Sequence, residues 1–228
     1  MESTLALALF LIVILASLEF FGFTRNLFLK LKDKEETREA ALSALDKMRV
    51  DLLAGGSGLL VPIELGLLEG IIQEEETLVI LSKEKDLSPI NGLLEGQTRI
   101  RLQSTQKVKK GREICIFDSH KGEVKSLSRV DKKSIVLSSP LRYSFLKEKT
   151  QVCLLKKISL FLDRDKQTLR RKTNSSPAQP LLEDAILFCF SYEKASNLAR
   201  LHLSLASNKE KKYEIFVFPK NAALAFRR

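Results

Sequence analysis

The sequence predicts an α+β fold in which one long N-terminal helix precedes a β-rich head. Residues 4–23 contain almost no polar side chain. Apolar residues then recur at helical spacing up to about Leu53, with charged residues between them. The remaining chain consists of short apolar runs separated by Gly, Pro, Asn and Lys, which is typical of strands. We therefore expect an apolar half-helix at residues 1–23, an amphipathic half-helix at 24–54 and a head at 55–228.

The apolar segment has the length of a membrane span. Residues 4–23 read TLALALFLIVILASLEFFGF, and Glu19 is their only charged residue. A helix needs about 20 apolar residues to cross the hydrocarbon core. A cleaved signal peptide is the alternative, but no basic residue precedes the run and no small-x-small pattern follows Leu15. We therefore expect residues 1–23 to be the transmembrane half of the helix.

The charges that flank this segment predict an orientation. Arg25, Lys30, Lys32 and Lys34 follow it, whereas only Glu2 precedes it. By the positive-inside rule the head would lie in the cytoplasm. This pattern favours one functional alternative, a bitopic membrane protein with a basic cytoplasmic binding domain.

A glycine-rich run ends the long helix. Residues 54–58 read AGGSG, and Gly55 and Gly56 are the predicted helix stop. The run lacks the Lys-Ser/Thr pair of a phosphate-binding loop. We therefore expect no nucleotide site here.

Nine apolar-rich runs in the head are candidate strands. Turn residues separate them, and the sequence Ser-His-Lys-Gly at 119–122 predicts a hairpin connection. The nine runs are residues 77–81, 98–102, 113–118, 123–130, 134–138, 152–162, 186–192, 198–206 and 214–218.

The chain is basic, with 38 Lys and Arg against 28 Asp and Glu and a net charge of +10. The densest patches are residues 107–112, 147–157 and 164–172, and no aromatic residues interleave with their charges as base-stacking surfaces require. We therefore predict a solvated basic surface and no nucleic-acid partner.

Residues that could carry catalysis or hold a metal are not grouped along the chain. His120 and His202 have no Cys, Ser or carboxylate partner at a recognisable spacing. Cys115, Cys153 and Cys189 form no C-x-x-C pair. We expect no cofactor, no metal and no enzymatic activity, although an exported hydrolase on an anchor is a further alternative. In an oxidising compartment two of the cysteines could pair, and the sequence does not choose which two.

Several stretches, taken in order, resemble type IV pilin-like proteins, in particular PilW-like minor pilins and PulJ-like pseudopilins. Residues 38–59 resemble a helix that ends in Asp-Leu and passes into a small-residue loop. Residues 154–173 resemble a strand followed by a polar turn and a Leu-Arg pair, and residues 179–192 resemble a leader to a buried strand ending in Tyr. Residues 198–205 resemble the strand after it.

The resemblance implies a structural subunit, a minor pilin or pseudopilin, of a type IV pilus or type II secretion filament. Its location would be the bacterial inner membrane as a single-pass protein, with the head in the periplasm and later in the pilus or pseudopilus. Its partners would be other pilin or pseudopilin subunits, the inner-membrane assembly platform and membrane lipid. Glu2 and Glu19 would make inter-subunit contacts during assembly. Glu2 matches the glutamate at the family's fifth mature position, so the true start is expected upstream of Met1.

Overall fold

The computed structural model describes the backbone of residues 2–223, and the side chains of these residues except 2–9, 12, 208–210 and 223. The chain forms two compact units, Met1–Ser43 and Ala44–Arg228.

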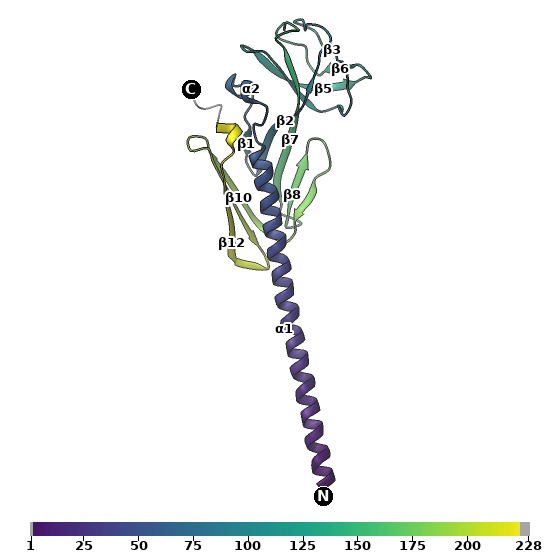
Figure 1. Cartoon of the computed structure of the whole chain (residues 1–228), viewed down its shortest axis with the longest axis vertical. Coiled ribbons are helices and arrows are strands. Elements are labelled where there is room, and N and C mark those ends of the chain that lie inside the picture. Colours follow the sequence, from purple (N-terminus) through teal and green to yellow (C-terminus); the bar gives the residue numbers. More distant parts are fainter. Residues whose placement is uncertain (1, 224–228) are drawn as a thin grey trace. The chain divides into compact units, whose positions relative to one another are not determined.

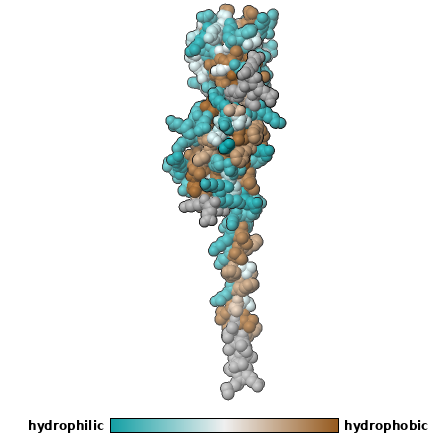
Figure 2. Space-filling view, turned by 90° about the vertical axis from the view of Figure 1, so that its left-hand side faces the viewer, coloured by the Kyte–Doolittle hydropathy of each residue, from teal (hydrophilic) through white to brown (hydrophobic). Residues whose placement is uncertain are grey.

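The first unit is a single helix, the N-terminal part of α1 (Glu2–Leu53). Its described large apolar side chains are exposed, among them Phe10, Phe20 and Leu31, and Figure 2 shows apolar side chains along the helix. Across the residues that the structure describes, no helix combines the length and the apolar content that a membrane crossing requires. This finding contradicts the predicted transmembrane half-helix and the predicted single-pass location in a bacterial inner membrane. The side chains of residues 4–9, where the predicted span begins, lie outside the described part.

The last turns of α1 belong to the second unit and bury one apolar face. Ala44, Leu45, Met48 and Leu52 are at most 4% exposed. Their three- and four-residue spacing places them on the same side of the helix. This face explains why the helical periodicity continues up to the end of α1.

Backbone hydrogen bonds mark the end of α1. The Gly55 N–H still donates to Leu52 O (3.0 Å), but the Gly56 N–H donates to Leu81 O on a strand (2.8 Å). Gly56 has a φ of +75°, a conformation that favours glycine. The chain therefore leaves the helix at the glycine pair and turns directly onto the sheet.

After α1 the second unit is almost entirely β-structure, with two further short helices, α2 (Leu60–Glu64) and α3 (Lys220–Ala223). The strands are β1 (Ile71–Glu74), β2 (Thr77–Leu87), β3 (Arg99–Arg101), β4 (Glu113–Phe117), β5 (Gly122–Val130), β6 (Ser134–Leu137), β7 (Gln151–Asp163), β8 (Thr168–Thr173), β9 (Gln179–Leu182), β10 (Ala185–Glu193), β11 (Leu198–Leu205) and β12 (Asn208–Val217).

The strands form two antiparallel sheets. The larger sheet has the order β1-β2-β7-β4-β5-β6-β3, and β8 pairs with both β7 and β9. Its longest strand, β7, pairs with β2 along most of its length, and with β4 and β8 along different parts. The smaller sheet has the order β10-β11-β12. Figure 1 shows β3, β5 and β6 gathered at one end of the β2–β7 pair and β8 near the other.

The central strands of the larger sheet contribute side chains to two separate apolar clusters. Successive residues of a strand point to opposite faces, so Ile114 and Ile116 of β4 enter one cluster while Cys115 and Phe117 enter the other. The first cluster includes Leu93, Ile100, Phe145 and Leu154. The second includes Leu59 just before α2, Ile63 within it, and Val79 of β2. Both faces of β4 are therefore buried, which is why its sequence, EICIF, lacks a polar alternation.

The observed architecture corrects the predicted fold class. The α+β fold with a transmembrane-to-amphipathic helix and a pilin-like head is wrong, because the chain is mainly β beyond one long helix for which no membrane span is found. The nine predicted strands are all present, and the predicted hairpin at 119–122 joins β4 to β5. The sequence missed β1, β8 and β9. The three-part division at residues 23 and 54 stays a prediction.

Candidate ligand-binding site

The sequence singled out Glu2 and Glu19 for assembly and Gly55 and Gly56 as the helix stop, and the two pairs belong to different units of the chain. The side chain of Glu2 lies outside the described residues, and Glu19 is exposed on the first unit. Gly55 and Gly56 lie at the end of α1 in the second unit. An inter-subunit role for the two glutamates is not tested by a single chain.

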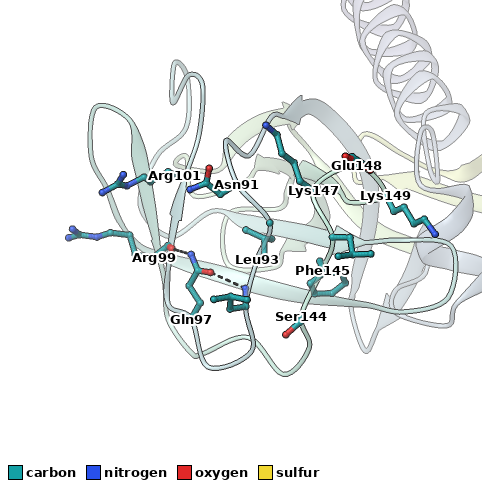
Figure 3. A pocket seen from close by; sticks show the side chains of 13 residues that line it. Asn91, Leu93, Gln97, Arg99, Arg101, Ser144, Phe145, Lys147, Glu148 and Lys149 are labelled. Atoms are coloured by element: carbon teal, nitrogen blue, oxygen red, sulfur yellow. Dashed lines mark hydrogen bonds between the residues drawn. The ribbon is translucent and has the colours of Figure 1, made fainter.

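A cavity of about 830 Å³ opens elsewhere in the second unit, and the sequence did not indicate it. Three segments line it: residues 91–97, strand β3 and residues 144–149 (Figure 3). The first two are close in sequence, whereas the third lies about fifty residues further on. The cavity therefore depends on long-range pairing.

An isolated pair of backbone hydrogen bonds joins the two loops. The Leu93 N–H donates to Phe145 O (2.9 Å), and the Phe145 N–H donates to Leu93 O (2.8 Å). Leu93 and Phe145 are each 2% exposed and belong to the first apolar cluster. The next residues, Leu94 and Leu146, are 68% and 71% exposed. The buried Leu93 and Phe145 therefore form the floor of the cavity, and the exposed Leu94 and Leu146 form its rim.

Gln97 forms hydrogen bonds that link residues 91–97 to β3. Its side-chain oxygen accepts a hydrogen bond from the Leu94 N–H (3.0 Å; dashed line in Figure 3), and its side-chain nitrogen donates to Arg99 O. The Gln97 carbonyl also accepts from the Leu141 N–H (3.0 Å). Gln97 therefore connects the loop with the start of β3 and with the segment at Leu141.

A buried ion pair on β5 anchors the chain that leads into the second loop. The Glu123 carboxylate accepts hydrogen bonds from the Arg142 N–H (3.0 Å) and the Tyr143 N–H (3.3 Å). Lys125 lies 2.9 Å from this carboxylate and donates to Pro140 O (2.7 Å). Both charged side chains are 7% exposed. Glu123 and Lys125 thus act as positioning residues for residues 144–149.

Cationic side chains flank the apolar floor on both sides. Arg99 and Arg101 are exposed on one face of β3, and Ile100, between them in sequence, is buried on the opposite face. Lys147 and Lys149 lie across Leu93 and Phe145 from them, as Figure 3 shows. Glu148 is the only carboxylate in the lining, so four cations and one anion leave a net charge of +3.

Most of these cations have no anionic partner among the described residues. Arg99 lies 3.8 Å from Asp131, whereas no carboxylate of the described part lies within 4.0 Å of Arg101, Lys147 or Lys149. Like charges held close together repel one another and attract an anion. The cavity therefore presents an uncompensated positive field over an apolar floor.

The side chains that line this cavity are mainly apolar and basic. They include no histidine and no cysteine, and a single carboxylate cannot form an acid–base pair. Elsewhere in the described part, no group of three or more His, Cys, Asp or Glu is arranged to hold a metal ion. An apolar floor with a few convergent charged groups is the usual composition of a ligand site.

Sequence reasoning treated part of this site as a solvated basic surface. Residues 147–157 were one of the dense basic patches, but only their first residues reach the cavity. The Arg-Ile-Arg sequence of β3 carried a usable signal, since its alternation predicts two cations on one face of a strand. Residues 91–97 carry no sequence pattern that would indicate a binding site.

No family model matches this chain, and no curated protein matches it. Three solved structures are similar to parts of it. The Gp54 tailspike of Acinetobacter baumannii bacteriophage AP22, in complex with an A. baumannii capsular saccharide, is 10% identical, with a TM-score of 0.30, over 34% of this chain and 15% of that chain. The tailspike protein gp49 from Pseudomonas phage LKA1 is 17% identical, with a TM-score of 0.27, over 30% and 14% of the two chains. The Pseudomonas phage phi297 tailspike gp61 is 13% identical, with a TM-score of 0.28, over 32% and 14%. These likenesses cover about a seventh of each tailspike and are too weak to support an argument about this chain.

These comparisons and the helix finding correct the expectations that followed from the pilin resemblance. No pilin or pseudopilin family model and no curated pilin matches the chain. The predicted membership of the PilW-like or PulJ-like type is contradicted. The same holds for the filament-subunit function, for the bitopic membrane alternative, and for the predicted pilin, assembly-platform and lipid partners.

Proposed function

We propose that the second unit is a binding module that takes an acidic peptide segment of a partner protein into the cavity between residues 91–97, β3 and residues 144–149. The observation that carries this proposal is the placement of four cations around an apolar floor. The peptide would place carboxylates against Arg101 and the two lysines. Between these carboxylates, an apolar side chain would contact Leu94 and Leu146.

Charge complementarity selects an anionic occupant. An exposed ion pair contributes about 0.2–1 kcal/mol, and burial of an exposed leucine contributes up to about 1.5–3 kcal/mol. After the cost of association, we expect a dissociation constant on the order of 10 µM at low salt. Attraction of this kind acts mainly on the association rate and is screened at physiological ionic strength.

The lining favours a peptide over a nucleic acid. Single-stranded nucleic acids bind by stacking their bases on exposed aromatic rings. Phe145 is the one aromatic residue of the lining, and it is buried in the floor. The exposed apolar groups are leucines, which suit an aliphatic anchor residue. We also propose that the module binds without catalysing a reaction, in keeping with the absence of an acid–base pair in this lining.

The test is a binding titration with a fluorescein-labelled peptide of alternating aspartate, glutamate and leucine, followed by fluorescence anisotropy. We expect the double variant Arg101→Gln/Lys149→Gln to weaken binding about two- to thirtyfold, because two charge contacts of about 0.2–1 kcal/mol each are lost. Lys109→Gln/Lys110→Gln is the matched control, since it removes two exposed lysines outside the cavity. Equal affinities of the two double variants would refute the proposal, as would equal binding of a peptide with glycine in place of leucine.

A further inference from the structure

We propose that Cys115 and Cys153 form a disulfide between β4 and β7 when the chain folds in the presence of a disulfide oxidant, and that Cys189 stays out of it. The sequence alone leaves open which two of the three cysteines pair. The register of the larger sheet selects one pair.

The two cysteines lie directly opposite each other on adjacent antiparallel strands. Cys115 and Cys153 are Cα partners, flanked by the pairs Ile114–Leu154 and Ile116–Val152. Opposite residues on antiparallel strands have Cα atoms about 4.5 or 5.5 Å apart. A disulfide accepts Cα separations of roughly 4.4–6.8 Å. Either type of pair position therefore allows the bond with little movement of the backbone.

Both side chains also point to the same face of the sheet. They belong to the second apolar cluster with Val79, Phe117 and Leu155, and both are 0% exposed. Cys189 is exposed on β10 of the other sheet, opposite His202. Pairing Cys189 with either buried cysteine would require β4 or β7 to leave the core.

The environment of the pair determines when the bond forms. Both thiols are fully buried in the second apolar cluster. A buried thiol is closed to large reagents, whatever its protonation state. The bond therefore forms while β4 and β7 are still assembling, and in the folded chain the pair reacts slowly in either oxidation state.

Oxidised glutathione supplies the balanced chemistry. One cysteine thiolate attacks a glutathione sulfur, which breaks the glutathione disulfide and releases one glutathione thiolate. The second cysteine thiolate then attacks the cysteine sulfur of the mixed disulfide and releases the other glutathione. The protein loses two electrons, glutathione gains them, and the two thiol protons end on two molecules of reduced glutathione.

The experiment refolds the full chain from denaturant and dithiothreitol into either a mixture of reduced and oxidised glutathione or fresh dithiothreitol. Free thiols are then blocked with N-ethylmaleimide in denaturant, so that buried thiols also react, and unreduced digests are mapped by mass spectrometry. In the glutathione buffer we expect a Cys115–Cys153 cross-linked peptide and alkylated Cys189, both in the wild type and in Cys189→Ser. We also expect a Tm about 5–10 °C higher in glutathione than in dithiothreitol, because the bond closes a loop of about 40 residues.

Two further variants serve as controls for the stability measurement. Cys115→Ala and Cys153→Ala should lose the Tm difference between the buffers, whereas Cys189→Ser should keep it. Cross-links that contain Cys189, glutathione retained on either buried cysteine, or alkylation of both buried cysteines in the glutathione buffer would overturn the proposal. The mapping of the wild type and of Cys189→Ser decides the matter even if the alanine variants do not fold.

Discussion

At the scale of single residues, an ion pair between Arg171 and Asp51 links the end of α1 to the sheet. Arg171 of β8 donates to both carboxylate oxygens of Asp51, at 2.6 and 3.0 Å, and Asp51 is 4% exposed. This hydrogen bonding raises the pKa of Arg171 above its already high value, against the opposing effect of burial. A two-point contact of this geometry is specific to the planar guanidinium group.

Replacement of Arg171 by lysine should therefore destabilise the second unit by about 1–3 kcal/mol, because one hydrogen bond to a buried carboxylate is lost. Arg164→Lys is the matched control, since Arg164 pairs with Glu76 where both side chains are more than 60% exposed. That change should cost less than about 0.5 kcal/mol. Urea denaturation, monitored by circular dichroism, measures the free energy of unfolding of both variants. Equal losses in the two variants would contradict the role assigned to the Arg171–Asp51 pair.

Asp118 makes the stability of the β4–β5 hairpin depend on pH. Burial acts to raise its pKa, but hydrogen bonds from the backbone N–H groups of His120 and Lys121 outweigh it and hold the pKa below the ordinary value. A carboxyl with a lowered folded pKa stabilises the protein above its unfolded pKa of about 4. This contribution is lost as the pH falls through the folded pKa.

Asp118→Asn should therefore lower Tm at about pH 6 but have a smaller effect at a pH below the lowered folded pKa of Asp118, where the aspartate is protonated in both states. Thermal unfolding of the wild type and the variant across this pH range measures the difference. A difference that stays constant, or that grows on acidification, would show that the carboxylate does not make the contribution assigned to it.

At the scale of elements, the glycine pair determines where α1 ends and the first strands begin. Gly56 has a positive φ, and an added Cβ would lie 3.2 Å from backbone atoms of Asn221 and Ala222. Both the left-handed conformation and the close backbone therefore favour glycine. The backbone of these neighbours cannot withdraw as easily as a flexible side chain.

Gly56→Ala should destabilise the second unit by about 1–3 kcal/mol, because it combines conformational strain with a steric contact. Gly66→Ala separates these two causes. Gly66 has a similar φ of +68°, but an added Cβ there meets nothing within 4 Å. The difference between the two variants in free energy of unfolding measures the contribution of the steric contact. Equal losses of stability would mean that the close approach at Gly56 contributes nothing.

At the scale of the whole molecule, local patterns predicted the elements but not their assembly. The nine predicted strands and the end of α1 near Leu53 are present because apolar periodicity and turn residues act over a few neighbours. β8 escaped prediction because its sequence, TLRRKT, is basic and its strand is specified by pairing with β7. β1 (IIQE) follows its two isoleucines with polar residues, and β9 (QPLL) contains a proline, which argues against a strand.

The candidate site could not be predicted from the sequence because its segments meet only through the fold. Leu93 and Phe145 are joined by backbone hydrogen bonds, which carry no residue signature. The exposure of Leu94 and Leu146 follows from that pairing. Similarly, the register of β4 and β7 selects the pair Cys115–Cys153, a choice that spacing along the chain left open.

The central claim is that charge around the cavity selects an acidic peptide, and a charge exchange tests it most directly. Anisotropy titrations would compare the acidic peptide with a peptide in which lysine replaces aspartate and glutamate, on the wild type and on Arg101→Glu/Lys149→Glu. We predict that the wild type binds the acidic peptide at least about tenfold more tightly and that the charge-reversed variant prefers the basic one. An unchanged preference for the acidic peptide in the variant would contradict the account.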